Sequence, residues 1–313
     1  MSGSSLGAAA LALVTVAWCC AQVDIEPRAR RPVPGAPVPA LRVDTNMVLV
    51  PVSVSDPMNR TVTGLELENF RLFDNGREQT ISRFSREDEP VAVGFVFDSS
   101  GSMGGKLDRS RTAATAFSKA ANPGDEFCLV TFDSSPKLLA PLTRDIGEVE
   151  NKILFSRSHG STALLDAILL GLAEIRKSKL TKRALLIISD GGDNNSRYSQ
   201  KEVRNVLQEA DVLIYAIGIF GGGSSAEEAS GPELMTRIAE STGGRMFPAS
   251  WAEINDIARA ISLELRNRYV LGFYPQDLKL DGRYHRLEVR MVSPRGLPLL
   301  HAHWRTGYYA PAP

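Results

Sequence analysis

Along the chain, apolar residues first alternate with other residues and then form continuous runs. Between residues 48 and 54 a valine stands at every second position, which is typical of a half-buried strand. From residue 91 onward, apolar runs of strand length, such as 91–97 and 184–189, alternate with segments of helical periodicity, such as 252–266. Because buried strands that alternate with helices form parallel sheets, we predict a doubly wound, mainly parallel α/β sheet.

After residue 268, apolar and polar residues again alternate as in half-buried strands, and we predict strands at 269–274, 284–292 and 297–305. The N-terminal β segment, residues 41–86, contains a tight-turn sequence at 74–76 but is too short to bury two sheet faces alone. We predict that it joins the C-terminal segment, 268–310, in one small β-sandwich, with the α/β domain of residues 90–266 inserted between them. The alternative is a separate N-terminal β domain, with the last strands extending the α/β sheet.

The start of the chain is typical of a signal peptide. The apolar run at 8–18 has the length of a signal-peptide core and is too short to span a bilayer. Small residues predict cleavage after position 21, so residues 1–21 form the signal and 22–40 a proline-rich linker. Lipid attachment at Cys19 or Cys20 is the alternative. We expect an exported protein, periplasmic, secreted or associated with the cell envelope, with no transmembrane span in the mature chain.

Charge and cysteine content narrow the classes of function. The chain carries 36 Lys and Arg against 36 Asp and Glu, and this balance argues against nucleic-acid binding, which normally requires a basic excess. Loss of the signal peptide would leave Cys128 as the only cysteine, so we expect no intramolecular disulfide and a thiol buried in the core. Function must therefore come from a local site.

Five side chains with oxygen ligands lie where a doubly wound sheet binds its ligands, beyond the carboxyl ends of the strands. They are Asp98, Ser100, Ser102, Thr162 and Asp190. Hard oxygen ligands without histidine or thiolate favour magnesium, with manganese and calcium as alternatives. Neutral hydroxyls would leave the cation able to accept a carboxylate from another molecule. The alternative is that Asp98, Ser102 and Thr162 only cap helices, which would leave Asp190 unexplained.

The order Asp-x-Ser-x-Ser, then Thr, then a strand-terminal Asp-Gly resembles the metal-ion-dependent adhesion site (MIDAS) of the von Willebrand factor A (VWFA) domain family. The resemblance covers residues 90–266. With the flanking strands, residues 42–310 are similar to secreted bacterial VWFA-related proteins with an immunoglobulin-like β portion. The resemblance to the adhesion site implies that Ser100, Ser102 and Thr162 are hydroxyl ligands of the metal ion. It also implies that Asp98 and Asp190 bind the ion directly or through water. Gly104 and Gly105 replace the acidic pair of the integrin β subunit, so the resemblance implies one ion.

These residues predict a non-enzymatic module for cell adhesion or scaffolding. The bound cation would complete its coordination with an acidic residue of a protein partner. One alternative is a structural or assembly protein of the envelope, in which the metal only stabilises the fold. Another is a metal-assisted hydrolase, for which His159 beside Ser161 is the candidate pair. A phosphate-binding loop is excluded, because Ser100 and Leu107 stand where it requires Gly and Ser or Thr.

Overall fold

The computed structural model describes residues 47–87, 89–221, 226–250, 253–276, 282–294, 296 and 298–310. The predicted signal peptide, the proline-rich linker and the candidate lipid-attachment cysteines lie outside these residues. None of the helices in the described ranges combines the length and the apolar character that a membrane-spanning helix needs.

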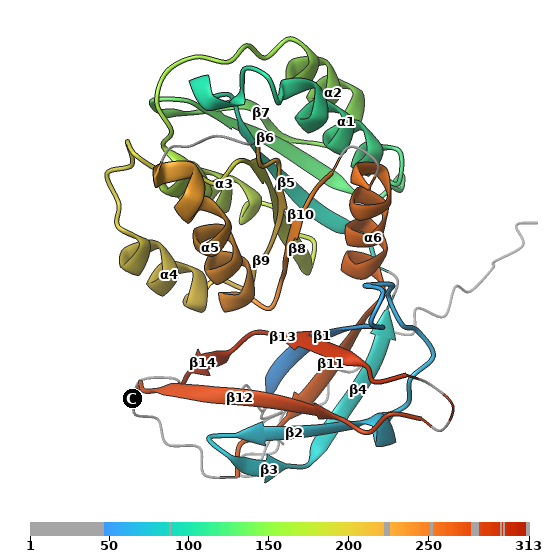
Figure 1. The fold of residues 1–313 in the computed structure, drawn as a ribbon. Coiled ribbons are helices and arrows are strands. Elements are labelled where there is room, and N and C mark those ends of the chain that lie inside the picture. Colours follow the sequence, from blue (N-terminus) through green and yellow to red (C-terminus); the bar gives the residue numbers. More distant parts are fainter. Residues whose placement is uncertain are drawn as a thin grey trace, which may run out of the picture. The chain divides into compact units, whose positions relative to one another are not determined.

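The middle of the chain forms a six-stranded sheet with helices on both faces (Figure 1). The strands, in spatial order, are β10 (Met246–Pro248), β9 (Leu213–Gly218), β8 (Lys182–Ser189), β5 (Val91–Asp98), β6 (Glu126–Phe132) and β7 (Pro136–Thr143). All neighbouring pairs are parallel except β6 and β7. The predicted α/β fold class is confirmed.

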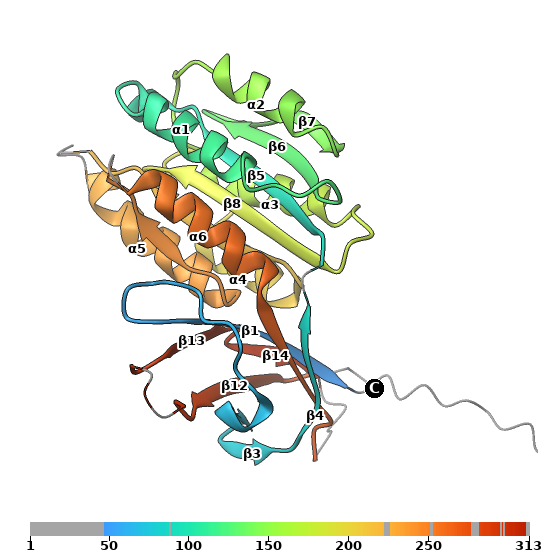
Figure 2. The ribbon, with the colours of Figure 1, turned by 90° about the vertical axis from the view of Figure 1, so that its right-hand side faces the viewer.

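Two apolar clusters hold this sheet between its helices. One cluster packs the sheet against α1 (Leu107–Ser118), α2 (Ile146–Leu154) and α6 (Ile254–Arg266). The other packs it against α3 (Leu164–Ile175), α4 (Gln200–Glu209) and α5 (Ala226–Ser241). Figure 2 shows the first group of helices in front of the sheet. Every residue of β5 is buried, as expected for a central strand covered on both faces.

The remaining strands form two antiparallel four-stranded sheets, and each sheet contains strands from both ends of the chain. The first has the order β13 (His301–Trp304), β1 (Val48–Ser55), β11 (Arg268–Phe273) and β4 (Ile81–Glu87). The second has the order β14 (Gly307–Tyr309), β12 (Tyr284–Met291), β2 (Phe70–Asp74) and β3 (Arg77–Gln79). Side chains from both sheets, including Val52, Leu72, Leu271 and Leu287, share one apolar core. The C-terminal strands therefore pair with the N-terminal ones instead of extending the six-stranded sheet.

A buried carboxylate links the six-stranded unit to β1. Glu264 on α6 is 1% exposed and accepts hydrogen bonds from Ser53 Oγ on β1, at 2.6 Å, and from the Tyr215 hydroxyl on β9, at 2.8 Å. It also forms an ion pair with Arg245, which donates to Asn59 Oδ1 at 3.1 Å. A buried charge is stable only when it is paired and hydrogen-bonded, and here each charge has both kinds of partner.

Candidate metal centre

The loop after β5 brings three of the five predicted ligands together. Asp98 ends the strand and is fully buried, and its Oδ1 accepts a hydrogen bond from the Ser100 backbone N–H at 2.9 Å. The hydroxyls of Ser100 and Ser102 lie 3.0 Å apart. A short 3-10 helix, Gly101–Met103, continues the turn into α1. A carboxylate and two hydroxyls therefore converge at the carboxyl end of the central strand.

The segment that carries Thr162 lies directly against this loop. The Gly101 N–H donates to the Gly160 carbonyl at 3.0 Å, and the His159 N–H donates to the Ser99 carbonyl at 2.9 Å. Gly160 has a φ of +75°, and a Cβ there would lie 2.6 Å from Ser134 Oγ, so both the backbone conformation and the packing require glycine. Thr162 is buried two residues further on.

The loop after β8 places Asp190 beside Asp98. Ser189 Oγ donates to Asp98 Oδ2 at 2.5 Å and accepts from the Gly191 N–H at 2.9 Å. Gly191 has a φ of +83° and packs against the backbone of Gly231 on α5, where a Cβ would come within 2.7 Å. Tight backbone packing therefore fixes the direction in which Asp190 leaves the strand.

Asn194 ties the Asp190 loop to Thr162. Its Oδ1 accepts from the Thr162 N–H at 2.9 Å, and its own N–H donates to the Thr162 carbonyl at 3.0 Å. Hydrogen bonds thus join all three loops. The side chains of Asp98, Ser100 and Ser102 meet through direct hydrogen bonds within their loop, whereas Thr162 is connected to the other loops through the backbone.

The electrostatics of the site fit a divalent cation. Burial raises the pKa of Asp98 to about 7, although hydrogen bonds from Ser100 and Ser189 oppose the shift, and the nearby Asp190 carboxylate raises it further. Asp190 Oδ1 is buried and has no hydrogen-bond partner in the described part of the chain. A buried carboxylate oxygen without a donor beside a second buried carboxylate is destabilising unless a cation is present. The donor set therefore matches a hard metal ion.

Helix capping does not account for these side chains. The residue that precedes α1 is Lys106 and the residue that precedes α3 is Ala163, and neither helix has a side-chain cap hydrogen bond. The short 3-10 helix begins after Ser100, again without a side-chain cap bond. The hydroxyls of Ser102 and Thr162 are thus not used as N-caps.

Lys106, which the sequence pattern did not identify, reaches into the site. Its Nζ lies 2.9 Å from Asp190 Oδ2, and its side chain is only 12% exposed. Its stem lies against Gly221, where a Cβ would come within 2.7 Å of Lys106 Cε. Ser189, which donates to Asp98, was also missed. Lys106 therefore supplies a positive charge to one of the two predicted carboxylate ligands.

Charged metal ligands or a His159–Ser161 pair near the site would indicate a different chemistry. Within the described ranges, no group of three or more His, Cys, Asp or Glu side chains is arranged to hold a metal ion. His159 is 63% exposed, and its Nδ1 lies 3.3 Å from Asp133 Oδ2. No hydrogen bond joins the side chains of His159 and Ser161 in the described part of the chain, so the pair expected of a hydrolase is not formed.

Comparisons with known proteins match part of the six-stranded unit to a known family. Residues 93–192 match the family model of the von Willebrand factor type A domain. The chain is 28% identical to an uncharacterized protein of Borreliella burgdorferi over 182 residues, 49% of this chain and 52% of the relative. It is 27% identical to inter-alpha-trypsin inhibitor heavy chain H4 of Bos taurus over 135 residues, 38% of this chain and 15% of the relative. The chain thus spans about half the length of the first curated relative and a small part of the second.

One solved structure has a similar fold over most of this chain, not only over the six-stranded sheet. The von Willebrand factor type A protein of Catenulispora acidiphila covers 85% of this chain and 62% of its own length, with a TM-score of 0.50 and 12% identity. At that identity the likeness concerns the fold alone. Within the α/β unit of this chain, residues 93–192 are similar to the von Willebrand factor type A domain family.

Proposed function

We propose that this protein binds a divalent cation at the carboxyl edge of its six-stranded sheet and, through it, an acidic side chain of a protein partner. Asp98, Ser100, Ser102, Thr162 and Asp190 would hold the ion, with magnesium preferred over manganese and calcium. The observation that carries the proposal is the buried, unpartnered Asp190 Oδ1 beside the buried Asp98 carboxylate. The cation would supply an electrophilic coordination position for the partner's carboxylate.

The residues of this chain have separate roles in that proposal. Asp98 and Asp190 supply the negative charge, and the serine and threonine hydroxyls complete the ligand set without neutralising the ion. Because three of the five groups are neutral, the site retains positive character towards an incoming carboxylate. The His159 side chain, the candidate base of the hydrolase alternative, lies 3.3 Å from Asp133 Oδ2, and this contact favours a binding role over hydrolysis.

Lys106 argues against a purely structural metal. Its ammonium already neutralises one oxygen of Asp190, so the fold has an internal positive charge at the site without any ion. A role in adhesion or as a scaffold of an exported protein therefore accounts for more of the site than metal-dependent folding. Export itself rests on the predicted signal peptide, residues 1–21.

Capture of partners from a cell-envelope extract tests this function. Immobilised wild-type protein should retain one or more proteins in magnesium and release them on addition of a chelator. Ser102→Ala, which removes an exposed hydroxyl ligand, should retain none of them. Ser250→Ala removes an exposed hydroxyl that donates to the nearby Glu253 side chain, and it should behave as wild type. Retention that survives both the chelator and Ser102→Ala would contradict the proposal.

Replacement of Lys106 tests how the ion pair and the cation compete. Lys106→Met should lower the stability of the metal-free protein by about 3 kcal/mol, because the buried Asp190 carboxylate loses its partner. It should also strengthen magnesium binding at least about tenfold, equivalent to about 1.4 kcal/mol, because no ammonium opposes the ion. Thermal unfolding and calorimetric titration measure the two effects. Lys119→Met, at an exposed position after α1, is the control, and equal affinities in all three proteins would refute the competition.

A further inference from the structure

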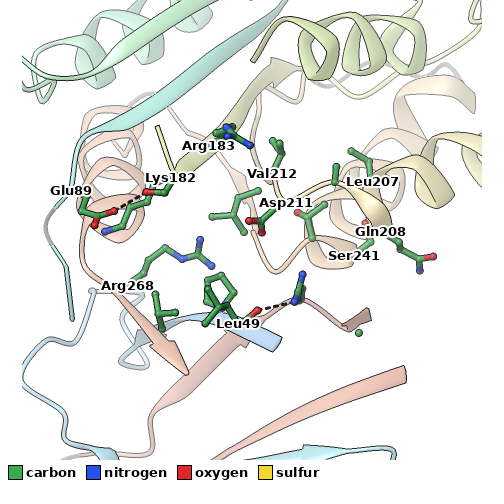
Figure 3. Close-up of a pocket in the computed structure, with 18 of the residues that line it drawn as sticks. Leu49, Glu89, Lys182, Arg183, Leu207, Gln208, Asp211, Val212, Ser241 and Arg268 are labelled. Atoms are coloured by element: carbon green, nitrogen blue, oxygen red, sulfur yellow. Dashed lines mark hydrogen bonds between the residues drawn. The ribbon is translucent and has the colours of Figure 1, made fainter. Parts of the chain in front are cut away.

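A second site lies at the opposite edge of the six-stranded sheet. A cavity of about 330 Å³ opens between the first residues of β8 and β9 on one side and strands β1, β4 and β11 on the other (Figure 3). Its volume is at the lower end of the range of small-molecule sites. Arg183, at the start of β8, is seven residues from Asp190, which corresponds to roughly 23 Å along an extended strand. The cavity is therefore separate from the candidate metal centre.

The lining of this cavity carries an excess of positive charge. Five basic side chains line it, against two acidic ones, Glu89 and Asp211. The basic residues are Arg83, Lys182, Arg183, Arg268 and Arg305. Since the whole chain has a net charge of zero, this concentration of cations is a local feature. Lys182 donates to the Arg266 carbonyl and Arg305 to the Leu49 carbonyl, so both of these hydrogen bonds go to neutral acceptors.

Three of these arginines have a buried Nε–H group without a hydrogen-bond acceptor in the described part of the chain. The Nε atoms of Arg183, Arg268 and Arg305 are buried and have no hydrogen-bond partner in the described part of the chain. Arg268 as a whole is 7% exposed, and in Figure 3 its guanidinium points into the cavity. Burial lowers the pKa of Arg268, while Tyr215, Glu264 and Asp211 oppose that shift. A buried N–H group without an acceptor is destabilising, so an anion in the cavity that accepts from these groups would be favoured.

The walls around the arginines are apolar. Leu49 and Pro51 of β1 line one side, and Val212 with Val270 of β11 contribute further surface. Guanidinium groups bind carboxylate and phosphate oxygens through paired N–H donors, and apolar walls favour a hydrocarbon body. We propose that this cavity binds a small organic oxyanion, with its carboxylate or phosphate head against Arg268 and Arg183 and a short apolar body along β1. This site is independent of the metal-dependent function.

Thermal unfolding and calorimetry with four probes test the proposal, all in the presence of a chelator so that no carboxylate can bind through a metal. Octanoate and octyl phosphate should both raise the melting temperature of the wild-type protein, and the larger rise identifies the preferred head group. 1-Octanol lacks the charge and inorganic phosphate lacks the apolar body, so each should bind at least about tenfold more weakly. Equal binding of 1-octanol and octanoate would overturn the proposal.

Replacement of Arg268 by methionine tests whether its guanidinium binds the anionic head group. It should weaken octanoate binding at least tenfold and abolish the rise in melting temperature that octanoate produces, because the guanidinium that points into the cavity is removed. Arg259→Met changes a 69% exposed arginine of α6 and should leave both quantities at their wild-type values. If Arg268→Met does not fold, Arg183→Met serves in its place with the same expected loss of binding. Wild-type affinity in the folded variant would overturn the proposal.

Discussion

Replacement of Glu264 by leucine should lower the free energy of unfolding by about 3–5 kcal/mol, the cost of removing one partner from a buried ion pair. The change would leave the Arg245 guanidinium buried without its carboxylate and would remove the acceptor of the Ser53 and Tyr215 hydroxyls. Because Glu264 connects α6 to β1 and β9, the loss should affect the six-stranded unit and the first β-sheet together. Urea unfolding followed by circular dichroism measures it.

A matched pair of variants separates the charge effect from the loss of packing. Glu233→Leu removes a carboxylate that is 70% exposed and forms an ion pair with Arg237 on α5, so it should cost less than about 1 kcal/mol. Combining Glu264→Leu with Arg245→Met should recover most of the lost stability, since no charge is then buried alone. A double variant no more stable than Glu264→Leu would show that the unpaired charge is not the cause.

Asp98→Asn should weaken magnesium binding at least about 100-fold. Loss of an outer-shell partner of a metal ligand typically costs 10–100-fold in affinity, and removal of a charged ligand should exceed that range. At a magnesium concentration 100 times the dissociation constant, wild-type protein should gain about 2.7 kcal/mol of stability, and the variant should gain almost none. Asparagine has nearly the size of aspartate, so its oxygen can still accept from the Ser100 N–H and the loop should retain its shape.

The control for this variant is an aspartate of the same region that does not face the site. Asp108 on α1 is 82% exposed and pairs with Arg111 at 2.8 Å. Asp108→Asn should bind magnesium as wild type does. If Asp98→Asn also binds magnesium with wild-type affinity while both variants remain folded, Asp98 is not a ligand.

The fold class could be predicted because continuous apolar runs mark strands that are buried on both faces. The pattern did not identify β7, because Pro136 and Pro141 count against a strand. In the structure β7 is at the edge of the sheet, where a missing N–H donor is tolerated. The position of a strand within its sheet decides whether proline is compatible with it, and the local sequence does not contain that information.

The site was predictable only in part for a related reason. Asp98, Ser100, Ser102 and Asp190 follow strand ends, so the topology alone brings them to one edge of the sheet. Lys106 contacts a residue 84 positions away, and its direction depends on how the chain at Gly221 packs against it. The cavity around Arg268 likewise draws its cations from β4, β8, β11 and the residue after β13, which are far apart in the sequence. Such long-range packing has no periodic signal in the sequence.

Anomalous diffraction from crystals of the wild-type protein grown with manganese tests the central claim most directly. We expect one anomalous peak within bonding distance of the Ser100 and Ser102 hydroxyls, with Asp98, Thr162 and Asp190 bound directly or through water, and with Lys106 withdrawn from Asp190. Crystals of Asp98→Asn grown in the same way should show no peak at that position. A wild-type map without a peak there, or with its peak elsewhere in the molecule, would show that these residues do not bind the ion.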